Sequence, residues 1–201
     1  MTATCNTSAQ EDFGFWRKLL NDVLLHRKLF WILTLLIVAA DLWSKDAAIT
    51  FVKDKMDSGE IIQEYWVAEP WFSLVDVKNT GGPWGVGSDY AQVLKVIRIL
   101  ALGVILYILA GTSHRNRFQQ LALAMVMGGA VGNIWDSLTL GHVRDFLKFD
   151  LDIPLADPLP AFNLADAMIC TGVFCLALSM IVTSFASRGE GSKEADGEAS
   201  G

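Results

Sequence analysis

Asparagine and aspartate recur three residues apart at two places in this sequence, and one more aspartate lies between the two pairs. Asn133 and Asp136 belong to the stretch GGAVGNIWDSLTLGHVRDFL, which also carries Asp145. Asn163 and Asp166 belong to the stretch FNLADAMICTGV. Asp145 and Asp166 flank one connection and could converge at the same depth. Two carboxylates that lie close together in a site of low dielectric cannot both ionise cheaply, so they can share a proton and act as base and acid on a peptide carbonyl.

The spacing of Asp145 and Asp166 also permits a purely structural role. Aspartate is favoured near the start of a helix, so Asp166 could cap a helix while Asp145 is a solvated acid in a loop. Asp41 and Lys45 are four residues apart, so they share a helix face and can neutralise one another. We expect Asp41 and Lys45 to form a structural pair near the outer end of a helix, where they support the site.

Other chemistries lack their sequence signals. The chain has no Walker-type glycine loop, no serine in a nucleophile elbow, no Cys/His cluster at zinc spacing and no basic cluster typical of nucleic-acid binding. Its three cysteines are Cys5, Cys170 and Cys175, of which the last two lie off a common helix face. We therefore expect no metal, no cofactor and no nucleic-acid partner, which leaves carboxylates and amides to do the chemistry.

The elements that must position these residues are strongly apolar. Of the 201 residues, 52% are hydrophobic and 19% are charged, and the mean hydropathy is +0.37. Four runs approach the roughly 20 residues that cross a bilayer as a helix. The first run begins near Leu29. The second extends from about Val93 to Gly111, the third from Leu121 to Trp135, and the fourth from about Ala165 to Ala186. The alternative is a soluble bundle of very apolar helices.

We predict an α-helical integral membrane protein with four transmembrane helices and a small extracytoplasmic β-rich segment between the first and second helices. Gly128, Gly129 and Gly132 indicate that the third run packs closely against another helix. Basic residues precede the first run and occupy the second connection, so those sides and both termini should be cytoplasmic. The predicted parts are a cytoplasmic leader with an amphipathic segment (1–28), the membrane domain (29–187) and a disordered cytoplasmic tail (188–201).

The polar segments taken together resemble those of the lipoprotein signal peptidases, also called signal peptidase II. The matching segments run from Asp41 to about Gly172 and are DLWSK, NTGGPWG, GGAVGNIWD, GHVRDF and FNLADAMICTGV. The resemblance implies an aspartic endopeptidase of the bacterial cytoplasmic (inner) membrane with its active site near the extracytoplasmic face. It also implies cleavage of prolipoproteins immediately before the diacylglyceryl-modified cysteine. Membrane lipid would be a second partner, and we expect a monomer.

The same resemblance assigns roles to single residues. It places the catalytic dyad on Asp145 and Asp166, and it suggests an outer sheet, formed around the stretch FSLVDVK, that cradles the substrate. The asparagines expected to contact the substrate backbone and the dyad are Asn79, Asn133 and Asn163. The residues expected to hold the site together are Asp136, Asp41 and Lys45, and those where the backbone must turn or approach closely are Gly81, Gly129 and Gly141.

Two positions depart from the family pattern. Ser137 follows Asp136 where the family usually has arginine, and we hypothesise that Arg144 supplies the missing charge. Gly82-Pro83-Trp84 stands where two small residues and an aromatic one are usual. Neither departure touches the proposed dyad.

Two other functions remain open at this point. A small proton-coupled transporter could relay protons along the acids in the spans, and a membrane scaffold would have no chemistry. The acids cluster at one boundary and the two halves of the chain show no evident repeat, which favours the peptidase over a transporter.

Overall fold

The computed structural model describes residues 23, 27–61, 63–81, 91–113, 115–151 and 159–198, with side chains described as far as residue 182. The predicted amphipathic segment before residue 28, apart from residues 23 and 27, and the sequence Gly82-Pro83-Trp84 lie outside these ranges. The helices are α2 (Lys28–Asp57), α3 (Ala91–Gly111), α4 (Arg117–Thr139) and α5 (Leu164–Glu198). The strands are β1 (Glu64–Ala68), β2 (Phe72–Asn79) and β3 (Val143–Phe149).

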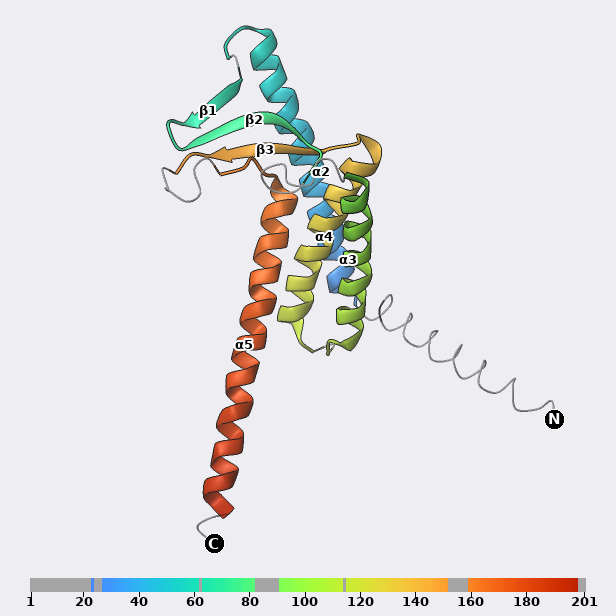
Figure 1. The fold of residues 1–201 in the computed structure, drawn as a ribbon, viewed down its shortest axis with the longest axis vertical. Coiled ribbons are helices and arrows are strands. Elements are labelled where there is room, and N and C mark those ends of the chain that lie inside the picture. Colours follow the sequence, from blue (N-terminus) through green and yellow to red (C-terminus); the bar gives the residue numbers. More distant parts are fainter. Residues whose placement is uncertain are drawn as a thin grey trace, which may run out of the picture.

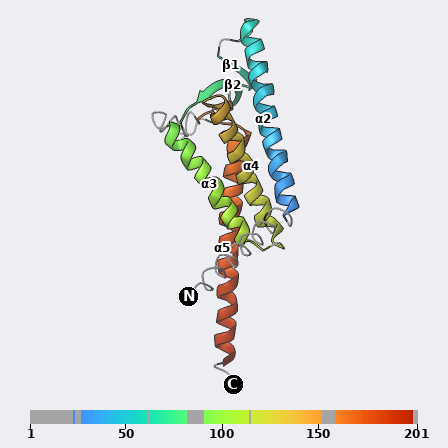
Figure 2. The same ribbon diagram turned by 90° about the vertical axis from the view of Figure 1, so that its right-hand side faces the viewer.

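The helices form an up-and-down bundle with a small sheet across one end (Figure 1). Helices α2 and α4 run toward the sheet, and α3 and α5 run away from it. Turned by 90°, the view shows α4 between α2 and α3 (Figure 2). This arrangement brings the ends of α4 and β2 and the start of α5 to the same end of the bundle, where the polar motifs of the sequence meet.

Helix α4 is the centre of the bundle because its glycines allow close approach. A Cβ atom at Gly129 would collide with the carbonyl oxygen of Ala165 on α5, and one at Gly132 would collide with the Asp41 carboxylate on α2. A Cβ at Gly128 would lie 2.7 Å from Ile37 Cγ2. The prediction that these glycines mark close helix packing is confirmed. The packing matters for the site because it brings the polar side chains of α2 and α5 against α4.

Three of the described helical segments are long and apolar enough to cross a membrane. They are Gln92–Gly111, Arg117–Thr139 and Leu164–Val182. Helix α2 spans 30 residues, but the charged side chains of Asp41, Lys45 and Asp46 interrupt its apolar character. The predicted membrane character of the fold is thus supported by three helices, and the fourth span remains a prediction.

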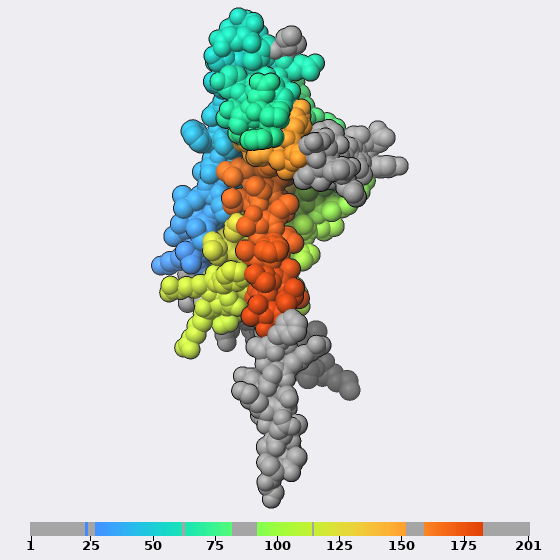
Figure 3. Space-filling model, turned by 90° about the vertical axis from the view of Figure 1, so that its left-hand side faces the viewer, coloured from blue at the N-terminus to red at the C-terminus, as the bar shows by residue number. Residues whose placement is uncertain are grey.

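The sheet is antiparallel with the strand order β1-β2-β3. Along the chain, β1 and β2 come between α2 and α3, as the sequence predicts. Strand β3 comes from the connection between α4 and α5. The pairs Leu74↔Leu147 and Val77↔Asp145 are separated by a register shift in β2, which is a β-bulge beside Asp145. Figure 3 shows the region of β1 and β2 (teal) lying above α5 (orange).

Helix α5 continues past the ends of the other helices as far as Glu198 (Figure 1). The sequence predicts a disordered tail from residue 188, so the helix covers most of that segment. Its membrane-length part, Leu164–Val182, ends before the tail begins.

Candidate active site

Strand β3 holds Asp145 because the chain before α5 pairs with it. The backbone N–H of Phe162 donates to the Leu147 carbonyl at 2.9 Å, and the N–H groups of Phe146 and Leu147 donate to the Phe162 carbonyl at 3.0 and 2.9 Å. Because Asn163 follows Phe162 directly, this pairing places the Asn163 side chain beside Asp145. Gly141, with φ +80°, makes the turn between α4 and β3 that a residue with a Cβ adopts only with strain.

Asp145 is buried, with 1% of its surface exposed. Its two oxygens accept hydrogen bonds from two amides: Asn79 Nδ2 lies 2.9 Å from Oδ2, and Asn163 Nδ2 lies 2.6 Å from Oδ1. Burial raises the pKa of Asp145 to about 6; the two amide hydrogen bonds oppose the rise, and the negative charge of Asp166 adds to it. The alternative that Asp145 is a solvated loop acid is therefore wrong.

Asp166 both caps α5 and faces the site. Its Oδ2 accepts from the backbone N–H of Asn163 at 3.1 Å, and its own N–H donates to Asn163 Oδ1 at 3.0 Å, which is a reciprocal cap of the helix start. Its other oxygen accepts from Asn133 Nδ2 of α4 at 2.8 Å. Asn163 thus contacts both carboxyl groups: its side-chain Nδ2 donates to Asp145, and its backbone N–H donates to Asp166.

A buried cation supports this arrangement from α2. Lys45 and Asp41 are fully buried and 2.7 Å apart, as their spacing predicts. Lys45 Nζ also lies 3.0 Å from Asn133 Oδ1 and 3.4 Å from Asp136 Oδ2. Because Lys45 occupies the oxygen of Asn133, the amide nitrogen of Asn133 must point at Asp166. Asp41 Oδ1 accepts from the backbone N–H of Ala165 at 2.9 Å, which ties the start of α5 to α2.

Arg144 ties β3 to α4. Its Nη2 lies 2.8 Å from Asp136 Oδ1, and its Nε and backbone N–H both lie 3.1 Å from Asp136 Oδ2. Its Nη1 contacts the exposed carboxylate of Asp46 on α2. The hypothesis that Arg144 supplies the charge missing at Ser137 stays a prediction, since the structure shows Arg144 paired with Asp136 and Asp46. Arg144 does not contact Ser137 among the described hydrogen bonds.

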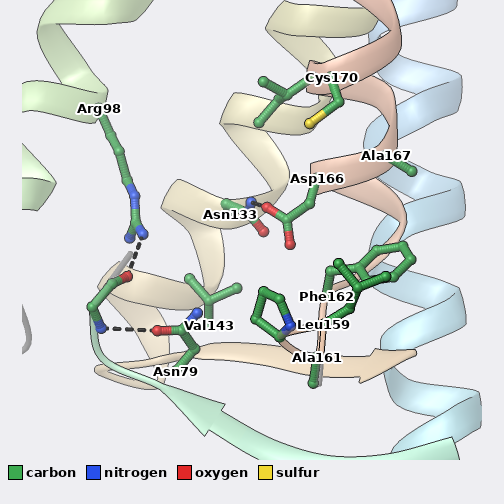
Figure 4. A pocket seen from close by; sticks show the side chains of 13 residues that line it. Asn79, Arg98, Asn133, Val143, Leu159, Ala161, Phe162, Asp166, Ala167 and Cys170 are labelled. Atoms are coloured by element: carbon green, nitrogen blue, oxygen red, sulfur yellow. Dashed lines mark hydrogen bonds between the residues drawn. The ribbon is translucent and has the colours of Figure 1, made fainter. Parts of the chain in front are cut away.

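A cavity of about 530 Å³ lies beside these residues. Its polar lining consists of Asn79, Arg98, Asn133 and Asp166, and its apolar lining includes Phe162 and Ile169. Figure 4 shows Asp166 and Asn133 on one side of it and Arg98 reaching in from α3. Asp145 is not among the described residues that line this cavity, but it accepts a hydrogen bond from Asn79, which is. The cavity is therefore an apolar pocket with amides and a carboxylate at one end. Such a pocket suits an extended peptide whose backbone meets the polar end while an adjacent apolar group fills the rest.

Arg98 is the cavity residue that the sequence analysis missed. Its Nη1 lies 2.9 Å from Ser137 Oγ, and its Nη2 lies 3.0 Å from the Gly81 carbonyl oxygen. The signal that could have found it is an arginine inside an apolar run whose other charged residue is Lys95, since such residues are costly in a membrane span.

Comparison with known proteins decides the family. The family model described as signal peptidase (SPase) II matches residues 33–182 of this chain. The chain belongs to the signal peptidase II family. Membership in this family makes the chain an aspartic peptidase, a hydrolase, and leaves the transporter and scaffold alternatives without support.

The alignments with relatives in the family extend over most of each relative's length. The lipoprotein signal peptidase of Maridesulfovibrio salexigens is 33% identical over 144 residues, which are 66% of this chain and 90% of the relative. That of Shouchella clausii is 30% identical over 152 residues (76% and 92%), and that of Bacillus subtilis is 29% identical over 156 residues (78% and 95%). The resemblance stated from the motifs is confirmed.

The fold is shared with two solved bacterial membrane enzymes whose structures were determined by the in meso method. The first, at 2.3 Å resolution, has a TM-score of 0.67 with 23% identity and covers 78% of this chain and 89% of its own. The second, at 1.9 Å resolution, has a TM-score of 0.64 with 24% identity and covers 76% and 92%. At this level of identity they show a shared fold alone, and the roles of single residues rest on the geometry above.

Proposed function

We propose that this chain cleaves the signal peptide from prolipoproteins immediately before the diacylglyceryl-modified cysteine, with Asp145 and Asp166 as its catalytic dyad. The observation that carries this proposal is Asn163, whose side-chain Nδ2 donates to the Asp145 carboxyl group and whose backbone N–H donates to that of Asp166, beside an apolar cavity. Two neighbouring carboxyl groups held by one residue can share a proton, and a nearby apolar pocket can hold the lipid-bearing residue. The family's lipoprotein signal peptidases supply the substrate class.

Water is the nucleophile in this proposal. Asp166 faces the cavity and takes a proton from water, which attacks the scissile carbonyl carbon. Asp145, whose pKa of about 6 favours the protonated form below that pH, gives its proton to the carbonyl oxygen and then accepts it back as the tetrahedral intermediate collapses. The proton that Asp166 took from water leaves with the amine. Asn133 and Asn163 keep both carboxyl groups in register while the proton moves.

The membrane places the substrate. We propose that α2 is a fourth span in the bacterial inner membrane, that both termini are cytoplasmic, and that the sheet end of the bundle lies at the extracytoplasmic face. A diacylglyceryl group anchors the scissile bond at a fixed depth, since each buried methylene contributes about 0.8 kcal/mol. A site at the membrane boundary meets that bond without drawing the peptide into hydrocarbon. The monomer is the form that these proposals require, because the described residues of one chain supply both carboxyl groups.

The test uses purified full-length protein in lipid with one prolipoprotein in diacylglyceryl-modified and unmodified forms. We expect cleavage of the modified form before the modified cysteine, and at least about a 100-fold lower rate for Asp166→Asn. Asp150→Asn is the matched control, because it removes a carboxylate five residues after Asp145 that pairs with Lys148 outside the site. Equal cleavage of both substrate forms, or unchanged cleavage by Asp166→Asn, would overturn the proposal.

A further inference from the structure

We infer that Arg98 is a positioning residue for the dyad: from α3 it clamps the chain after β2 so that the Asn79 amide stays on Asp145. This inference rests on the proposed function and names a residue that family motifs do not assign. It is carried by a continuous set of hydrogen bonds that leads from α4 through Arg98 to the buried carboxyl group.

The bonds follow one another without a gap. Arg98 Nη2 donates to the Gly81 carbonyl oxygen at 3.0 Å. The backbone N–H of Gly81 donates to Asn79 Oδ1 at 2.9 Å, which leaves the Asn79 nitrogen to donate to Asp145 Oδ2 at 2.9 Å. Because an amide nitrogen donates and an amide oxygen accepts, the Gly81 contact fixes which end of Asn79 meets Asp145. Figure 4 shows the clamp from Arg98 to the chain that carries Asn79.

The other end of the clamp is anchored on α4. Arg98 Nη1 donates to Ser137 Oγ at 2.9 Å, and that hydroxyl donates to the Asn133 carbonyl at 2.9 Å. The guanidinium is planar and presents its donors in a fixed fork, so it can hold Ser137 and Gly81 at once. A lysine ammonium at this position would be a point donor with a different reach.

The orientation of Arg98 on α3 also points to a role in the site. The flanking residues Ile97 and Ile99 are half exposed, on the surface that a bilayer would cover, whereas Arg98 lies in the wall of the cavity. A charged residue in a span is costly unless it faces the protein interior and finds partners there. Arg144, the other arginine near the site, is engaged by Asp136 and Asp46. Arg98 is therefore the cation that occupies the space beside Ser137, where the family pattern has an arginine on α4.

The test compares kcat, KM and pH profiles of the full-length protein with diacylglyceryl-modified prolipoprotein. For Arg98→Ala we expect kcat to fall about tenfold with KM changed less than about threefold, because a displaced catalytic group lowers the rate of the chemical step. For Arg98→Lys we expect kcat to fall about threefold. Lys95→Gln, one turn earlier on α3, is the matched control and should retain the parent kcat.

The pH profile separates positioning from a general loss of structure. The charged groups that act on Asp145 are Asp166 on α5 and Lys45 on α2, and neither is altered by these variants. Since the Asn79 hydrogen bond lowers the pKa of Asp145, loosening Asn79 moves the alkaline limb of kcat to higher pH. The double variant Arg98→Ala/Ser137→Arg returns a guanidinium to the same space from α4 and should recover most of the lost kcat.

The outcomes distinguish this inference from the proposed function. If the parent cleaves and Asp166→Asn does not, but Arg98→Ala and Arg98→Lys keep the parent kcat and pH profile, Arg98 has no positioning role. A fall in kcat with no movement of the alkaline limb and no recovery by Ser137→Arg would also overturn the inference. If Arg98→Ala does not fold, Arg98→Lys and the double variant carry the test through the same two measurements. An inactive parent would overturn the proposed function itself.

Discussion

Four of the described carboxylates surround Asn133 and Asn163 at the sheet end of this bundle, and they are held in two different ways. Asp41 and Asp136 are fully buried and lie within 2.7 and 3.4 Å of the Lys45 ammonium, and Asp136 also pairs with Arg144 at 2.8 Å. Asp145 and Asp166 instead receive hydrogen bonds from the side-chain amides and backbone N–H groups of Asn79, Asn133 and Asn163 among the described contacts.

This difference in hydrogen-bond partners distinguishes the residues that we expect to support the site from those that we propose to be catalytic. Asp41 and Asp136 are held by direct contact with cations, which suits a supporting role. The hydrogen bonds described for Asp145 and Asp166 come from neutral amide and backbone donors, and we propose that these two residues exchange the proton. The two pairs are nevertheless joined, because Lys45 contacts the same Asn133 that binds Asp166.

The largest effect on stability is expected where the cation of the first pair is removed. Lys45→Met leaves Asp41 and Asp136 buried with less compensation, and breaking such a buried pair costs about 3–5 kcal/mol. Thermal unfolding in detergent measures the loss. Lys53→Met is the control: its side chain is 56% exposed beside Asp76, and such pairs contribute at most about 1 kcal/mol. Equal stability of the two variants would remove the distinction between the carboxylate pairs.

A pH titration of stability sharpens the same distinction. The folded pKa of Asp145, about 6, lies above its ordinary value of 3.8, so the folded protein holds this proton more tightly than the unfolded chain. The resulting contribution, about 3 kcal/mol, is fully present below pH 4 and is lost as the pH rises through 6. The parent should lose stability relative to Asp145→Asn across this window. Parallel stability curves for the two proteins would contradict the assigned pKa.

A smaller effect is expected for the arginine that joins the two regions. Arg144→Ala releases Asp136 from β3 and should lower prolipoprotein cleavage about tenfold, because β3 carries Asp145. Lys148→Ala, four residues later on the same strand, removes only partly exposed pairs with Glu64 and Asp150 and should change the rate less than about twofold. Equal effects of the two substitutions would show that Arg144 has no special part in the site.

The sequence predicted which residues meet at the site better than it predicted the elements that support them. Asp145, Asp166 and the three asparagines are brought together as the motifs implied, and Asp41 pairs with Lys45 as helix spacing required. Helix spacing accounts for the Asp41–Lys45 pair. The contacts of Asp145 and Asp166 with Asn79, Asn133 and the Asn163 side-chain amide join segments 18 to 66 residues apart, and the resemblance to the family, not spacing, implied them. The predicted close packing at Gly129 and the turn at Gly141 are also confirmed.

The missed features depend on contacts between distant segments. Strand β3 was not predicted because Asp145 and Arg144 break its apolar alternation, and its pairing with β2 and Phe162 decides its conformation. Helix α2 continues to Asp57, beyond the predicted apolar run. The run stopped earlier because the last turns of the helix are polar. Arg98 was missed because its partners, Gly81 and Ser137, lie 17 and 39 residues away. The periodicity of apolar residues along a helix or strand does not predict contacts between segments so far apart.

The central claim is that the amide-held pair, Asp145 and Asp166, performs the cleavage. The direct measurement is the single-turnover cleavage rate of modified prolipoprotein, per mole of folded enzyme, for Asp145→Asn and Asp166→Asn. Asp145→Asn should unfold at or above the parent's temperature near pH 7, and both variants should fold and cleave at least about 100-fold more slowly. A folded variant of either residue that cleaves at the parent's rate would contradict the account.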